Sequence, residues 1–130
     1  MRFVMDIPEN KYPDCTLEDN YKKALTELVL LYLLSKKECY ITELTDIMRE
    51  KSQGVIDIVF PYGAIYRLEE HGYIVEERKR IAPDGRRRQY LRITESGRDY
   101  LKHLMGIYRR CSGAFADILE EEDSNLHQET

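Results

Sequence analysis

A chain of 130 residues predicts a single domain with one small core. Its net charge of −4 would on average repel nucleic acid, so a DNA-binding surface would have to be concentrated in one segment. The longest apolar run, residues 28–34, is too short to cross a bilayer, and the three widely spaced cysteines predict neither a disulfide framework nor a zinc site. With no apolar signal core near the N-terminus, we expect a cytoplasmic protein.

The first half of the chain predicts an arm followed by two helices. Residues 1–16 contain two prolines and form an N-terminal arm of unassigned role. Thr16 and Asp19 have the spacing of a weak capping box, and Tyr21 to Lys36 predicts helix one. Helix two is predicted from Thr42, as its cap, to about Lys51, where Ser52-Gln53-Gly54 ends it.

A short third helix and a two-stranded hairpin follow. Residues 60–71 predict the helix, with Pro61 at its start and Gly72 at its end. Its spacing places Tyr62, Ala64 and Arg67 on an outward face, although Tyr62 could instead belong to the core. Residues 73–93 predict two strands around the turn Ala82-Pro83-Asp84-Gly85.

The hairpin concentrates positive charge. Residues 78–92 hold seven basic side chains and one acid, a net charge of +6, so the rest of the chain sums to −10. Such a segment can neutralise several phosphates and release their counterions. The alternative is an ordinary solvated hairpin, since charged edge strands also prevent aggregation.

The last helix, predicted over residues 94–120, has the clearest periodicity and precedes an acidic tail at 121–130. It is about 40 Å long at ~1.5 Å per residue, which is more than a small domain needs to cover its core. The excess predicts a dimer seam, or alternatively an intramolecular lid. The seam residues, spaced 3 and 4 apart, are Leu101, Leu104, Tyr108, Cys111, Phe115 and Ile118.

Two blocks of this sequence resemble the PadR family of bacterial transcriptional regulators. Residues 62–74 read YGAIYRLEEHGYI, similar to the family's tyrosine-bearing recognition helix, and residues 86–97 read RRRQYLRITESG, similar to its basic wing and the pattern that follows. Looser matches extend the resemblance over about residues 22–120, and the size is that of the subgroup with a single C-terminal helix. The position before Tyr62 is Pro61 where the family has leucine.

The resemblance implies a mostly helical α+β fold, with a winged helix-turn-helix domain over residues 17–93 and a dimerisation helix over 94–120. It implies a homodimeric regulator, expected to be a repressor, that binds a palindromic operator in double-stranded DNA and responds to a small aromatic or drug-like effector. The alternative is a winged-helix adaptor that binds a protein and has no operator. The expected DNA-binding residues are Tyr62, Gly63, Ala64, Arg67, Lys79, Arg80, Arg86, Arg87 and Arg88.

Enzymatic function is not expected. The three histidines lie in three segments, none at a spacing that would chelate a metal with another histidine or cysteine. The sequence has no glycine-rich phosphate loop and no nucleophile elbow. We therefore predict no catalytic residue, no metal, no cofactor and no membrane partner.

Overall fold

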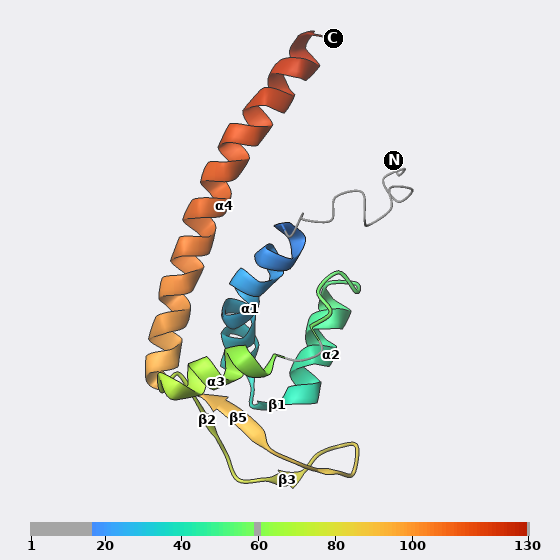
Figure 1. Ribbon diagram of the computed structural model, residues 1–130, viewed down its shortest axis with the longest axis vertical. Coiled ribbons are helices and arrows are strands. Elements are labelled where there is room, and N and C mark those ends of the chain that lie inside the picture. The colour runs from blue at the N-terminus through green and yellow to red at the C-terminus, as the bar shows by residue number, and fades with distance from the viewer. Residues whose placement is uncertain (1–16, 59–60, 130) are drawn as a thin grey trace.

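The computed structural model describes residues 17–58 and 61–129, and the side chains of these residues up to Glu120. Figure 1 shows three short helices gathered above a small sheet, with a hairpin projecting below and a long C-terminal helix along one side. The fold is mostly helical with a small antiparallel sheet, as the sequence predicts. The elements are α1 (Leu17–Lys36), β1 (Cys39–Tyr40), α2 (Ile41–Lys51), α3 (Tyr62–Glu70), β2 (Ile74–Glu76), β3 (Arg80–Ile81), β4 (Arg87–Arg88), β5 (Tyr90–Ile93) and α4 (Glu95–Glu129).

The core lies where α1, α2 and α3 meet the sheet. The apolar run at 28–34 is buried as predicted, apart from Tyr32 and the half-buried Val29, and among the described residues no helix is long and apolar enough to cross a membrane. Full burial of a leucine or isoleucine side chain in this core contributes about 1.5–3 kcal/mol to the free energy of folding. The largest fully buried side chains are Leu30, Leu31, Leu44, Leu68, Ile74, Leu91 and Cys39.

The hairpin predicted at residues 73–93 is present but divides into two ladders. Near the core, β5 lies between β1 and β2 in a three-stranded antiparallel sheet. Farther out, β3 and β4 pair with each other, with Arg80 opposite Arg88. Between the ladders, the Gln89 side chain donates to the carbonyl of Glu77. The third strand, β1, was not predicted, because a two-residue strand has no periodicity to detect.

Helix boundaries follow the predicted stop signals more closely than the predicted caps. Helix α2 ends at Lys51, followed by Gln53 and Gly54 with φ of 56° and 87°. The prediction that Thr42 caps α2 is wrong: Tyr40 is the N-cap and makes no side-chain capping bond. The predicted capping residue Thr16 lies outside the described residues.

Helix α3 ends in a Schellman motif. Gly72 has φ of 76°, its N–H donates to Glu69, and the N–H of Tyr73 donates to Leu68 at 2.9 Å. The prediction that Gly72 ends this helix is confirmed, and the motif turns the chain directly into β2.

Helix α4 starts one residue later than predicted and runs past Glu120 to Glu129, so the segment predicted as a separate tail continues the helix. Thr94 caps it: the Thr94 hydroxyl accepts the N–H of Gly97 at 3.0 Å and donates to the carbonyl of Gly72. A Cβ atom on Gly97 would lie 2.1 Å from the carbonyl oxygen of Tyr73. Only glycine therefore lets α4 pack this closely on the chain entering β2.

Candidate nucleic-acid interface

The outward face of α3 carries two tyrosines. Tyr62 is 55% exposed and Tyr66, one turn later, is 64% exposed. The alternative that Tyr62 belongs to the core is therefore wrong. The prediction that Ala64 faces outward is also wrong, because Ala64 is 7% exposed. The inner stripe of the helix is Ala64, Ile65 and Leu68.

Arg67 is exposed as predicted, but its side chain is bonded to a neighbouring helix. Its Nε donates to the Glu27 carboxylate on α1 at 2.7 Å, which draws the guanidinium toward the flank of α3. Gly63 lies one turn before it, and a Cβ atom there would lie 3.7 Å from the nearest guanidinium nitrogen of Arg67. The sequence did not reveal this contact, since Glu27 and Arg67 are 40 residues apart.

Asp84 organises the tip of the hairpin. Its carboxylate accepts the backbone N–H of Arg86 at 2.9 Å and a side-chain N–H of Arg88 at 2.6 Å. These two bonds hold the pKa of Asp84 below its usual value, and the bond from Arg88 has the larger effect. Gly85 has φ of 84°, and the N–H of Ala82 donates to Arg86 at 2.8 Å. The predicted turn is thus held closed by its one acidic residue.

Two of the arginines predicted to contact DNA, Arg80 and Arg88, are bound within the chain by aromatic rings and carboxylates. The guanidinium of Arg80 lies 3.8 Å from the centre of the Tyr90 ring and donates to Glu38 at 2.6 Å. Arg88 lies 5.1 Å from the centre of the Tyr40 ring, and the two tyrosine rings meet edge to face. Alternating cations and aromatic rings therefore attach the outer ladder to β1 and β5.

The seven basic residues of the hairpin divide into those with an acidic partner and those without. Arg92 pairs with Glu77 at 2.8 Å, so three of the seven, Arg80, Arg88 and Arg92, have acidic partners. Four are exposed and form no ion pair within the described residues: Arg78, Lys79, Arg86 and Arg87. Arg78 was not among the predicted site residues, although it belongs to the +6 segment.

The residues predicted for the dimer seam divide into two groups. Leu101 and Leu104 are half-buried against the core of their own domain. Farther along α4, Tyr108 is 39% exposed, and Phe115 and Ile118 are each 65% exposed. Cys111 is exposed on the same stripe. The second half of α4 projects beyond α1 in Figure 1, and the α4 residues that pack on the described core, Tyr100, Leu101 and Leu104, lie in the first half.

Comparison with known proteins decides the family. Residues 30–103 match the family described as transcriptional regulator PadR-like, which is more than half of the chain. The chain belongs to the PadR-like family of transcriptional regulators. This is a family of regulators and not of enzymes, and its members are typically DNA-binding dimers. No match was found among the curated proteins.

Solved structures share the PadR-like fold. A transcriptional regulator from Clostridium thermocellum is 25% identical with a TM-score of 0.67, over 75% of this chain and 96% of its own. A transcriptional regulator from Streptococcus is 27% identical with a TM-score of 0.65, over 74% and 93%. A PadR-like transcriptional regulator from Bacillus cereus, 22% identical with a TM-score of 0.65 over 75% and 93%, is alike in fold. In a winged helix-turn-helix fold, α3 has the position of the recognition helix and the hairpin of residues 77–90 has the position of the wing.

A stack of four rings joins the recognition helix to α4 in this PadR-like chain. His71, the C-cap of α3, stacks on Tyr73 with ring centres 5.7 Å apart, and Tyr73 stacks on Tyr100 at 4.2 Å. The ring of His103 follows at 6.3 Å. A cavity of about 190 Å³ beside the stack is lined by Glu27, Arg67, Leu68, His71, Tyr73 and Tyr100.

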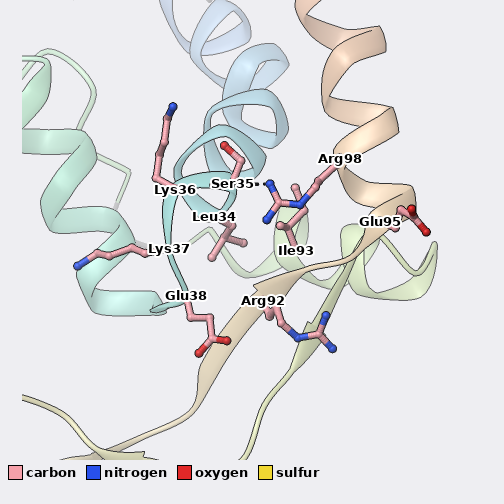
Figure 2. Close-up of a pocket in the computed structure, with 9 residues that line it drawn as sticks. All are labelled: Leu34, Ser35, Lys36, Lys37, Glu38, Arg92, Ile93, Glu95 and Arg98. Atoms are coloured by element: carbon pink, nitrogen blue, oxygen red, sulfur yellow. Dashed lines mark hydrogen bonds between the residues drawn. The ribbon is translucent and has the colours of Figure 1, made fainter.

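A larger hollow of about 490 Å³ lies between the end of α1, β5 and the start of α4. Figure 2 shows that its charged side chains do not converge: Lys36, Lys37 and Arg92 point in different directions. Arg98 donates to the carbonyl of Ser35 at 3.4 Å, in the last turn of α1. This contact places a cation at a helix C-terminus, so the hollow contains a structural contact but no assembled ligand site.

The described residues contain no group of three or more histidine, cysteine or acidic side chains that could hold a metal. Cys39 is buried, and burial raises the pKa of its thiol to about 11, so it is unreactive at neutral pH.

Proposed function

We propose that this PadR-like regulator is a cytoplasmic homodimeric repressor that binds a palindromic operator and is released by a small aromatic or drug-like effector. The observation that carries the DNA-binding part is the group of four exposed basic side chains of the wing that form no ion pair with any described residue. An acidic chain that keeps these side chains unpaired on one projecting hairpin favours a phosphate surface there and repulsion elsewhere.

Recognition is assigned to α3. Tyr62 lies in its first turn, the end that points at base edges in helix-turn-helix proteins, and Gly63 leaves the backbone open to close approach. The basic side chains of the wing would contact phosphates along the minor groove and fix the register of α3 on the DNA. Arg80 and Arg88 would support the wing, and Arg67 would reach a phosphate only by leaving Glu27.

Dimerisation is assigned to the exposed stripe of α4, from Tyr108 to Ile118. Two-fold pairing there would place two recognition helices on successive turns of a duplex, about 34 Å apart, and would match a palindrome.

The effector would bind in the cavity of about 190 Å³, between α1, α3 and the start of α4. Arg67 and His71 line this cavity and can meet an anionic group. A ligand there would contact both the recognition helix and the dimerisation helix.

The test separates a repressor from a winged-helix adaptor. Fluorescence anisotropy on a mixed-sequence duplex at 50 and 200 mM salt should show affinity that falls with salt. A dimer has eight such basic side chains, four in each wing. They would give a slope of log affinity against log salt of up to about −7. An adaptor would bind no duplex with a salt-dependent affinity, and that result would rule out the proposed repressor.

A further inference from the structure

The outward face of α3 has only one side chain of the kinds that usually read purines. Its single basic residue, Arg67, is held by Glu27, and the helix, YGAIYRLEE, contains no lysine, asparagine, glutamine, serine or threonine. The exposed residues of α3 are Tyr62, Gly63, Tyr66, Arg67 and Glu70, and the Arg67 side chain donates to Glu27 of α1.

We propose that this helix reads thymine through its 5-methyl group, and that Tyr66 makes the contact. The inference rests on the proposed function, because it assumes that α3 enters the major groove. In that groove each base pair presents its own pattern, and the thymine methyl is its one apolar feature. Guanine is usually read by arginine or lysine and adenine by asparagine or glutamine. Of these residue types α3 carries one, Arg67, whose Nε already donates to Glu27. A 64% exposed aromatic ring fits the methyl group.

Glu70 supports the choice of base. It is exposed one turn after Tyr66, and a carboxylate only accepts hydrogen bonds. It cannot bind the acceptor edge of guanine, and it repels phosphates. In the major groove this carboxylate could accept a hydrogen bond only from the amino group of cytosine or adenine, so Glu70 disfavours guanine and leaves Tyr66 as the apolar contact for thymine. The wing supplies the charge.

The experiment replaces only the methyl group. The full chain selects duplexes from a randomised pool, and the enriched duplex is then copied with thymidine or deoxyuridine triphosphate. Deoxyuridine keeps every hydrogen-bonding group of thymidine but lacks the methyl. Burial of one methyl-sized group corresponds to about a fourfold change in affinity. Two symmetric half-sites therefore predict that the wild-type chain binds the uridine duplex about 15-fold more weakly.

Variants assign the effect to one residue. Tyr66→Ala should bind both duplexes equally, and Tyr66→Phe should keep the wild-type preference because the ring and not the hydroxyl makes the contact. Glu70→Ala is the matched control on the same face and should keep the preference too. Since Tyr66 is largely exposed, we expect unchanged thermal melts for its variants.

Equal binding of the two duplexes by the wild-type chain would overturn the inference, even if the selection yields a clear operator. It would also be overturned if Tyr66→Phe lost the preference as fully as Tyr66→Ala, since the hydroxyl would then be the reader. If no duplex were enriched and binding showed no salt dependence, the proposed function would be wrong and this inference with it.

Discussion

Each arginine of the wing has one of two kinds of surroundings. Arg80 and Arg88 lie over aromatic rings and donate to carboxylates, so their positive charge is already compensated within the chain. Arg86 and Arg87 project from the tip into solvent. A guanidinium that stays hydrated and unpaired can replace counterions on DNA, whereas one that must first leave an internal carboxylate contributes less.

This difference predicts separate phenotypes for neighbouring arginines. Replacing Arg86 and Arg87 with alanine should weaken binding to all duplexes alike, because phosphate contacts carry no sequence information. The salt slope of the dimer should become shallower by about 3 to 4, at roughly 0.9 per lost contact. Thermal stability should not change. Anisotropy titrations over a series of salt concentrations, with melting curves, measure both quantities.

Arg88→Ala is the matched control. It removes the bond to Asp84 and the contact with the Tyr40 ring, so we expect a lower melting temperature and a nearly unchanged salt slope. If Arg88→Ala reduced the salt slope as much as one of the tip arginines, the division of the wing into support and contact residues would be wrong.

At the scale of elements, the connection between wing and α4 is held by hydrogen bonds and a close backbone contact. Thr94 bonds back to Gly72 and caps α4, and Gly97 lies against the backbone of Tyr73. The pattern Thr-x-x-Gly thus has a physical reason: threonine satisfies the first turn of the helix and glycine allows its close approach to the chain entering β2. A movement of α4 would be transmitted to the end of α3 through the same contacts.

Gly97→Ala tests this connection. A Cβ atom there would lie 2.1 Å from the Tyr73 carbonyl and 2.8 Å from the Ile93 side chain, so the backbone must shift. We expect a loss of about 2–3 kcal/mol in the free energy of unfolding, measured by urea denaturation. Gly106→Ala is the control in the same helix, with no atom within 4 Å of its Cβ. It should gain up to about 1 kcal/mol from helix propensity. Equal changes in the free energy of unfolding for Gly97→Ala and Gly106→Ala would show that helix propensity, and not the close contact at Gly97, determines the effect.

Local patterns predicted the helices and the wing because the cause of each is local. The 3.6-residue periodicity placed α1 and α4, and the turn at Asp84 placed the wing. The partners of Arg67 and Arg80 lie 40 and 42 residues away in the chain, so no pattern around either arginine reveals that it is held. Ala64 was misplaced because a nine-residue helix leaves its inner stripe open to more than one interpretation. Tyr66 could have been found from its spacing of four from Tyr62.

At the scale of the whole molecule, the charge is separated between two ends of the fold. The wing carries the basic side chains that form no ion pair among the described residues. Residues 117–130 carry six acidic residues and no lysine or arginine. Between them, α4 is about 50 Å long at ~1.5 Å per residue, and among the described residues the core packs against Tyr100, Leu101 and Leu104 in its first half. The exposed Phe115 and Ile118 are open to contact with another surface, and a second copy would offer the same stripe in an isologous contact.

The last prediction concerns this assembly. The wild-type chain should have the mass of a dimer at tens of micromolar by light scattering, about the concentration at which such assays work. Phe115→Glu with Ile118→Lys should give the monomer mass, because the cost of removing two charged groups from water in an apolar seam exceeds what their mutual attraction returns. The control is Arg110→Glu with Asp117→Lys, which exchanges charges at exposed positions away from the seam and should remain dimeric. Since the single domain has its own core, circular dichroism should show the seam variant folded. A wild-type chain that is monomeric under these conditions would contradict the dimer before any variant is made, and the palindromic operator would then lose its structural basis.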